Sequence, residues 1–280
     1  MVTAARVLSL RGVTATSRHI PVCLSIAGSD SGGGAGIQAD LKAFARAGVH
    51  GTTAITAITA QNTVAVTAVE AVSPEMIVAQ VRAVVEDIGV DAVKIGMLGS
   101  VASAEAVSRA LDLLPPGTPV VVDPVMIAES GARLLDPDAQ QALVGLVVAR
   151  ATVVTPNVPE ARVLAGDDAG DVEALARAVR ALGPEAVVVT GGHRDQAVDV
   201  LFDGERVVEM PGDRYADGAA HGSGCTHSAT LAARLALGDD LVAAAREAKR
   251  VASEAVRDGL REIGRGAGPV DVVGIGVKVG

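Results

Sequence analysis

Short runs of branched apolar residues alternate with longer amphipathic stretches along most of the chain. The short runs are rich in Val and Ile and predict buried strands, whereas the longer stretches carry apolar residues three and four positions apart and predict helices. The predicted strands comprise residues 22–27, 49–60, 64–72, 91–97, 119–122, 151–154, 186–189, 198–202 and 206–210. The predicted helices comprise residues 37–47, 74–88, 103–114, 137–148, 171–182, 228–237 and 239–260, with a further short helix beginning at Pro159.

Capping residues mark several ends of these helices. Ser73 precedes a Pro-Glu pair, and a serine followed by proline is typical of a helix start. Gly48 and Gly238 follow two other helices, at the position where a left-handed residue commonly ends a helix. An Asp-Gly pair at residues 203–204, between two short strands, predicts a hairpin.

Strands that alternate with helices of about ten to fifteen residues build right-handed βαβ units around one sheet. We therefore expect a single α/β domain over residues 22–280, with three layers (α/β/α) and a central, mostly parallel sheet. No linker-like run and no internal repeat interrupts these residues. Residues 1–21 differ, because they contain three arginines and no acidic residue. Their composition resembles a transit peptide, but no cleavage-like site stands out, and we expect a disordered N-terminal extension.

Composition and charge disfavour several classes of protein. Of the 280 residues, 49% are hydrophobic and 1% aromatic, so the core must consist of small and branched aliphatic residues, and no aromatic platform exists for single-stranded nucleic acid. The net charge of −9 disfavours a nucleic acid or an anionic membrane as partner. No run approaches the ~20 apolar residues of a membrane span. Two cysteines in a chain of this length do not suggest a disulfide scaffold, and we expect a cytoplasmic protein.

The leading candidate for chemistry is the stretch 218–226, Gly-Ala-Ala-His-Gly-Ser-Gly-Cys-Thr, which leads into a predicted helix. Its glycines allow a tight turn whose N–H groups point inward, and a helix N-terminus attracts phosphate. Cys225 lies on the first turn, where the helix dipole would lower the pKa of the thiol and favour a thiolate base. A glycine-rich turn before a helix is nevertheless common, and a cysteine among small residues more often packs than reacts.

Candidate binding residues follow the predicted strands, at the edge where parallel sheets bind ligands. They are Asp30, Gln61, Met97, Asp123, Asn157, Glu160 and His193. The turn before Cys225 belongs to the same edge, which favours the phosphate interpretation. Asp123 and Glu160 supply carboxylate oxygens that suit Mg²⁺ beside a nucleotide. Each also has a structural alternative, because Asp123 can cap a turn and Glu160 can complement a helix dipole.

The glycine-rich loop at residues 28–36 fits neither familiar phosphate-binding motif. A Walker loop ends in Gly-Lys-Ser/Thr, but the first lysine of the chain is Lys42. Residues 34–39 match the dinucleotide pattern, but no acidic residue for the ribose occurs between Asp40 and Glu70. The dinucleotide interpretation is therefore weak, and no spacing of His and Cys suggests zinc.

Seven blocks of sequence occur in order between Val22 and Pro269. They are AGSDSGGGAGIQADLK (27–42), ITAQNT (58–63), KIGM (94–97), DPVM (123–126), TPNVPE (155–160), GGH (191–193) and HGSGCT (221–226). Together they resemble the hydroxymethylpyrimidine/phosphomethylpyrimidine kinases of thiamin biosynthesis, a family of the ribokinase-like superfamily. The resemblance implies a ribokinase-like fold and two phosphoryl transfers from ATP with Mg²⁺ at one site, first to 4-amino-5-hydroxymethyl-2-methylpyrimidine and then to its monophosphate.

The same resemblance implies roles for single residues. The implied pyrimidine-binding residues are Gly28, Ala35, Asp40, Gln61, Met97 and Val125. The implied nucleotide-binding residues are Asn157, Thr190 and Gly192, and the implied Mg²⁺ ligands are Asp123 and Glu160. The implied catalytic residues are Gly222, Ser223, Gly224 and Cys225.

Gln61 would hydrogen-bond the aminopyrimidine edge, and Cys225 would accept the proton of the substrate hydroxyl while the preceding amides stabilise the phosphoryl group. From its chemistry alone, Asp40 can equally lie on the solvated face of the first helix. Many members of the family carry a phosphate-contacting Lys where this chain has Thr190, so one cationic contact is missing, and Arg194 or Mg²⁺ could compensate.

Two alternatives stay open. A pyridoxal or pyridoxine kinase of the same superfamily would also act on a planar heteroaromatic ring with a hydroxymethyl group, although Gln61 and Met97 favour the pyrimidine. A pyrimidine-binding regulator without catalysis is disfavoured by the intact Gly-Ser-Gly-Cys turn. Strand order and oligomeric state cannot be derived from the sequence. We expect a homodimer whose partners are the small-molecule pyrimidine and ATP.

Overall fold

An eight-stranded sheet forms the centre of the molecule, which a computed structural model describes over residues 19–126, 137–191, 197–215 and 218–276. The strand order is β10-β9-β8-β7-β6-β5-β1-β2. The strands are β1 (Val22–Ala27), β2 (His50–Ile55), β5 (Ala92–Ile95), β6 (Val120–Val122), β7 (Val153–Val154), β8 (Ala186–Val189), β9 (Asp199–Phe202) and β10 (Val207–Met210). Neighbours from β2 to β8 pair in parallel, and the predicted hairpin β9–β10 continues the sheet in antiparallel pairing.

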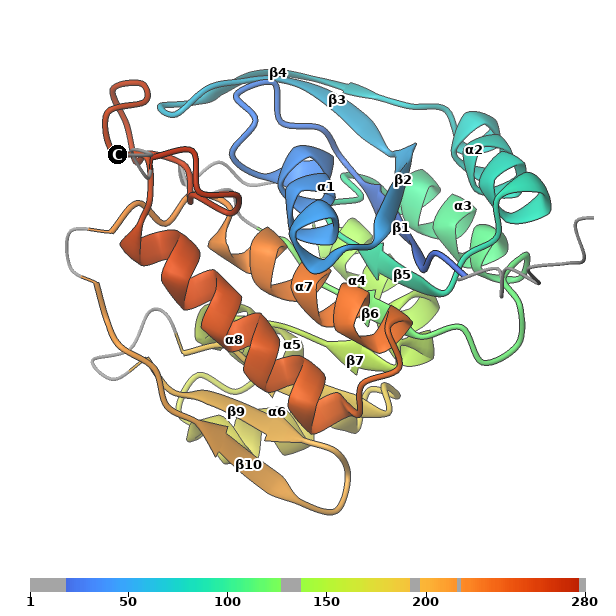
Figure 1. Ribbon diagram of the computed structural model, residues 1–280. Helices are drawn as coiled ribbons and strands as arrows, with labels where there is room; N and C mark the ends of the chain where they lie inside the picture. Colours follow the sequence, from blue (N-terminus) through green and yellow to red (C-terminus); the bar gives the residue numbers. More distant parts are fainter. Residues whose placement is uncertain (1–18, 127–136, 192–196, 216–217, 277–280) are drawn as a thin grey trace, which may run out of the picture.

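Helices cover both faces of this sheet (Figure 1). One face carries α1 (Gly36–Ala47), α7 (Ser223–Ala236) and α8 (Leu241–Arg257). The other carries α2 (Pro74–Asp87), α3 (Val101–Leu111), α4 (Pro137–Leu146), α5 (Val158–Ala165) and α6 (Val172–Arg180), with the short 3-10 helix η1 (Val148–Arg150). The predicted three-layer α/β/α architecture is confirmed.

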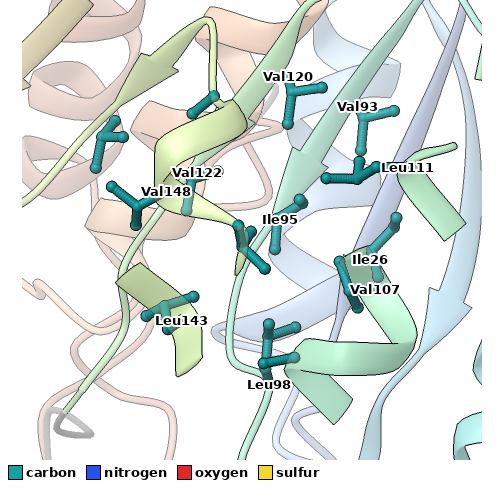
Figure 2. Packing of buried hydrophobic residues seen from close by; sticks show 14 of the residues in the cluster. Ile26, Val93, Ile95, Leu98, Val107, Leu111, Val120, Val122, Leu143 and Val148 are labelled. Carbon is teal, nitrogen blue, oxygen red and sulfur yellow. The ribbon is translucent and has the colours of Figure 1, made fainter. Parts of the chain in front are cut away.

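Alternate residues of each strand point to opposite faces and fill two separate cores. In β5, Val93 and Ile95 belong to the core beneath α2 to α6, and Ala92 belongs to the core beneath α1, α7 and α8. Figure 2 shows the first of these cores, in which strand residues lie against Val107 and Leu111 of α3. By the same alternation, Lys94 shares the face of Ala92, which brings a charged side chain under α1.

Side chains and glycines end the helices where the sequence predicts. The Ser73 hydroxyl accepts a hydrogen bond from the amide of Met76 at 3.3 Å, and Gly48 ends α1 in the left-handed conformation with φ 77°. Asn157 and Glu160 form a reciprocal capping box at the start of α5, with N–H···O distances of 2.9 and 3.0 Å. The capping box fixes the position of the Glu160 carboxylate relative to the end of β7.

The single strand predicted over residues 49–60 is wrong, because the chain breaks at Thr56 into β2 and β3 (Ala57–Gln61). The Thr56 amide donates to the Ala27 carbonyl at 3.1 Å, and its hydroxyl donates to the Met97 carbonyl at 2.7 Å. After this anchor β3 leaves the main sheet and pairs with β4 (Val66–Ala71) in a separate, antiparallel two-stranded sheet.

The residues just before β1 lie at the predicted boundary between the N-terminal extension and the domain. Residues 1–18 of the expected N-terminal extension lie outside the described residues, but its last three residues are held at the sheet. The Pro21 carbonyl accepts from the amide of His50 at 2.8 Å, and His19 contacts the Asp91 carboxylate at 2.9 Å. His19 and Pro21, the described residues on either side of Ile20, thus contact the segment before β5 and the main sheet, respectively. Within the described ranges, no helix has the length and apolar content needed to cross a bilayer.

Candidate active site

A cavity of about 450 Å³ opens where the parallel strands end. Its walls come from the segments after β1, β3, β5, β6, β7 and β8 and from the start of α7. The lining includes thirteen of the residues selected from the sequence: Gly28, Ala35, Gln61, Met97, Asp123, Val125, Asn157, Glu160, Thr190, Gly222, Ser223, Gly224 and Cys225. Gly192 lies outside the described residues. Of the candidates chosen because they follow predicted strands, six line this cavity (Asp30, Gln61, Met97, Asp123, Asn157 and Glu160), and His193 lies outside the described residues.

The N-terminus of α7 forms one wall of this cavity. Gly222 precedes the helix with φ 87°, a left-handed conformation that favours glycine, and a side chain at this position would overlap the carbonyl oxygen of Gly34. The glycine therefore allows two loops to touch directly. The first turn of α7 faces the cavity with the amides of Gly224 and Cys225, which have no partner inside the helix, whereas the Ser223 amide donates to the Ala220 carbonyl at 3.0 Å.

Asp30 holds the glycine-rich loop against this turn. Its carboxylate accepts from the amides of Gly32, Gly34 and Ala35 at 2.8, 3.0 and 2.8 Å, and His221 Nε2 lies 2.9 Å from Asp30 Oδ2. Burial raises the pKa of Asp30, but the hydrogen bonds from His221 and the amides outweigh burial and hold this pKa below its usual value. Two loops almost two hundred residues apart in the sequence are thus joined by one buried carboxylate.

Asp40 does not line the cavity, which corrects its assignment as a pocket residue. Its side chain is completely buried, so the alternative of a solvated helix face is wrong as well. The carboxylate accepts from the Ser25 hydroxyl at 2.6 Å and from Lys94 Nζ at 2.9 and 3.1 Å. Lys94 does line the cavity, and its Nζ lies 4.0 Å from Asp123 Oδ2. Asp40 therefore contacts a cavity-lining side chain, Lys94, and acts on the other cavity residues only through its charge.

Cys225 faces the cavity as a neutral thiol rather than as the thiolate expected from the helix dipole. Burial raises the pKa of Cys225 to about 12, and the nearby carboxylates of Asp123 and Asp40 add to this effect, while the Lys94 ammonium opposes it. The expectation of a lowered thiol pKa is therefore wrong. Loss of water around the sulfur outweighs the attraction of the helix N-terminus and of one buried cation.

Asp123 and Glu160 face the same cavity and repel each other. The Asp123 carboxylate accepts from the Ser228 hydroxyl at 3.0 Å, and burial raises its pKa. Burial and the charge of Asp123 together raise the pKa of Glu160 to about 8. No cluster of three or more His, Cys, Asp or Glu side chains suited to a metal occurs in the described part of the chain. Two carboxylates beside open space fit a divalent cation that takes its other ligands from phosphate and water.

The pyrimidine side of the cavity, as the sequence predicts it, lies around Gln61 at the end of β3. The backbone amide of Gln61 donates a hydrogen bond to the Ser31 hydroxyl at 2.7 Å. The Thr59 hydroxyl donates to Gln61 Oε1 at 3.3 Å. Gly28 donates to the Met97 carbonyl at 3.1 Å, and a side chain on Gly28 would overlap the end of Met97. Gly28 and Met97 are therefore in direct contact and form one continuous wall of the cavity.

The comparison with protein families decides the membership of the chain. The model of the phosphomethylpyrimidine kinase family matches residues 30–271, which include almost every residue discussed above. The chain belongs to the phosphomethylpyrimidine kinase family. It is therefore a kinase of thiamin biosynthesis, and the alternative of a regulator without catalysis is not retained.

Curated relatives and solved structures agree with this membership. A hydroxymethylpyrimidine/phosphomethylpyrimidine kinase of Rhizobium meliloti is 49% identical over 257 residues, which cover 89% of this chain and 96% of that protein. A bifunctional thiamine biosynthesis protein of Geobacter sulfurreducens is 43% identical over 253 residues, which cover 89% of this chain and 51% of that protein.

Two solved structures resemble the fold of this kinase. The phosphomethylpyrimidine kinase of Clostridium difficile has 40% identity and a TM-score of 0.74, over 84% of this chain and 99% of that chain. An ADP complex of Bacillus subtilis pyridoxal kinase has 36% identity and a TM-score of 0.83, over 93% of this chain and 100% of that chain. The ribokinase-like fold is confirmed, and the ADP-bound neighbour supports the use of ATP.

Sequence reasoning missed several residues of the kinase cavity. Lys94, Asp199, His227 and Lys249 line the cavity but were not selected. A lysine inside an apolar strand was a usable signal for Lys94, because a buried lysine needs a charged partner. Asp199 begins β9, which is antiparallel to β8. The start of β9 therefore lies at the edge where the parallel strands end, and a search of the residues that follow strands does not select it.

Proposed function

We propose that this kinase transfers the terminal phosphoryl group of ATP to 4-amino-5-hydroxymethyl-2-methylpyrimidine, and then a second one to the monophosphate product. One observation carries the proposal: the N-terminus of α7 and Gln61 line the same cavity, in a chain of the phosphomethylpyrimidine kinase family. A phosphoryl donor bound at α7 therefore lies next to a substrate bound at Gln61.

The flat ring lies against the wall that Gly28 and Met97 form together, with Ala35 and Val125 completing its contacts. The Gln61 carboxamide, which has both a donor and an acceptor, pairs with the amino group and ring nitrogen of the pyrimidine. Asp40 has no direct contact with the ring, because its oxygens are used by Ser25 and Lys94.

The amides of Gly222, Gly224 and Cys225 stabilise the charge of the migrating phosphoryl group, and Asn157 and Thr190 hold the nucleotide. Cys225 contacts the substrate hydroxyl and takes its proton as the new P–O bond forms. Because the free thiol is neutral, Cys225 must first lose its own proton to solvent, and the Lys94 ammonium is the group that stabilises the resulting thiolate.

Asp123 and Glu160 would hold Mg²⁺, partly through water, beside the phosphates of the nucleotide. The bound cation would neutralise charge on the phosphate oxygens during transfer. Its positive charge would also relieve the repulsion between the two carboxylates. Asp123 is oriented for this role by Ser228, and Glu160 by the capping box with Asn157.

Pyridoxine is the second candidate substrate, because the B. subtilis neighbour with a TM-score of 0.83 is a pyridoxal kinase. The two proposals are separated by kcat/KM for the pyrimidine and for pyridoxine with ATP and Mg²⁺. We expect a preference for the pyrimidine of at least about tenfold, because the Gln61 carboxamide loses a partner on a ring without the matching edge. A preference for pyridoxine would overturn the assignment. Cys225→Ala is the control, expected to bind the pyrimidine without phosphorylating it.

We infer further that two copies of the chain associate through the outer face of the β3–β4 sheet. Ile58, Ala60, Ala68 and Glu70 share this face and are exposed, with Ile58 55% accessible. The two-stranded sheet is not hydrogen-bonded to the main sheet, so its outer face has no covering layer in the described part of one chain. A symmetric contact between two such faces would bury these residues.

A further inference from the structure

A cluster of buried charged side chains lies in the part of the cavity near Thr190, apart from the residues given roles above. Asp199 at the start of β9, His227 on α7 and Lys249 on α8 all line the cavity. The cluster adjoins the end of β8, since Asp199 Oδ1 accepts from the amide of Gly191 at 2.8 Å. The same oxygen accepts from Lys249 Nζ at 2.7 Å.

His227 is the unsatisfied member of this cluster. It is only 3% exposed, and neither ring nitrogen makes a hydrogen bond within the residues that the structure describes. Nε2 lies 3.4 Å from Asp199 Oδ2 without forming one. A neutral imidazole always carries one N–H donor, and a buried donor without a partner is costly. A ligand with acceptor atoms in the cavity would remove that cost.

The ammonium group of Lys249 also has more N–H donors than partners among the described residues. An ammonium group carries three N–H donors, and Asp199 is the one partner that the described residues supply. Burial raises the pKa of Asp199, but His227, Lys249 and the Gly191 amide lower it below its usual value, so the carboxylate stays ionised. Asp199 thus fixes the position of the ammonium group, whose other donors remain for a ligand of the cavity.

We propose that Lys249 and His227 donate hydrogen bonds to the phosphate chain of the bound nucleotide, with Asp199 as the positioning residue for Lys249. The proposal rests on the ATP-dependent function proposed above. A phosphate chain is favoured over the ribose or the base, because the cluster offers donors while Asp199 Oδ1 already accepts two hydrogen bonds. Lys249 would thereby provide the cationic contact that the neutral hydroxyl of Thr190 cannot.

The test compares the Kd of ADP with that of adenosine by titration calorimetry without Mg²⁺. The variants are His227→Leu and the double variant Asp199→Asn/Lys249→Met, which leaves no unpaired buried charge. Arg246→Met is the control, because it removes an exposed cation from the same helix. We expect each test variant to bind ADP about 10- to 100-fold more weakly, as for the loss of a hydrogen bond to a charged group, with the Kd of adenosine unchanged. The control should match the wild type.

Two results would overturn the proposal: an unchanged affinity for ADP in both test variants, or an equal loss of affinity for adenosine, which would place the contact at the ribose or base. The KM of the pyrimidine should be the same in the test variants as in the wild type. A higher KM would indicate that the substitutions disturb the whole cavity rather than the phosphate contact alone. ADP binding does not depend on which alcohol is phosphorylated. Failure of the wild type to phosphorylate the pyrimidine would therefore overturn the proposed substrate alone.

Discussion

Lys94 is the residue on which the electrostatics of the cavity depend. Burial opposes its charge, but Asp40, Cys225 and Asp123 raise the pKa of the ammonium group, which therefore stays protonated. The Asp40 contact at 2.9 Å compensates this charge beneath the cavity, where no water reaches it. A fixed positive charge thus lies under the thiol of Cys225, without lowering its pKa into the physiological range.

The raised pKa of Cys225 predicts how its reactivity depends on pH. Iodoacetamide reacts with the thiolate, so with a pKa of about 12 the rate of alkylation should rise about tenfold per pH unit from pH 7 to pH 10. The rate is measured by mass spectrometry of the intact protein without ligands. Cys23 is the other cysteine and is completely buried, so Cys225→Ala is the matched control and should remain unmodified. A plateau of the rate near pH 8 would contradict the raised pKa.

Single residues could be predicted from the sequence where a topological rule places them. Asp123 directly follows β6 and Asn157 follows β7 by three residues, and parallel strands end at one edge of the sheet. Asp40 was misplaced because helix periodicity does not reveal a charged partner that lies 54 residues away in Lys94. Lys249 lies on a helix with no local motif, so its place in the cavity depends on how α8 packs onto the sheet.

At the scale of elements, the contact between the glycine-rich loop and the start of α7 sets the geometry of the phosphate side. Gly222 touches Gly34 too closely for any side chain, and the Asp30–His221 hydrogen bond closes the contact. By contrast, a side chain on Gly224 would meet its first neighbouring atom at 3.9 Å, the Asp123 Oδ2 atom. Of these two glycines, Gly224 therefore has space for a side chain and Gly222 does not.

This difference predicts opposite effects of two alanine substitutions on stability. Gly222→Ala adds a methyl group against backbone and imposes a left-handed φ on alanine, so the free energy of unfolding should fall by about 2 kcal/mol or more. Gly224→Ala lies in the first turn of a helix with room for the methyl group and should leave stability unchanged or slightly raised. Urea denaturation followed by circular dichroism measures both. Equal stability of the two variants would contradict the close contact with Gly34.

The elements themselves were largely predictable, because caps and hydrophobic periods are local signals. The break between β2 and β3 was not, since Thr56 continues a run rich in Thr, Ile and Ala that fits one long strand. The break is imposed by hydrogen bonds to Ala27 and Met97, which are partners on other strands or loops. The β3–β4 sheet, and the position of Gln61 over the cavity, therefore follow from tertiary contacts rather than from propensity.

At the scale of the whole molecule, segments distant in the chain close around the cavity. The β3–β4 turn meets the loop after α8, where the Thr63 hydroxyl accepts from the amides of Arg265 and Gly266 at 3.1 and 3.2 Å. Pro269 forms a bridge to His221 in the turn before α7. The turn of the two-stranded sheet is thereby fixed to the rest of the chain, while the outer face that carries Ile58 stays exposed.

The exposed outer face predicts the oligomeric state. If two copies associate through it, multi-angle light scattering should give a mass about twice the 28.0 kDa of one chain. Ile58→Asp adds a charge opposite Glu70 on this face and should yield monomers, because the contact would have to bury an additional carboxylate. Ile88→Asp, at an exposed isoleucine at the end of α2, should remain dimeric. A monomeric wild type, or an Ile58→Asp variant that stays dimeric, would rule out this face as the interface.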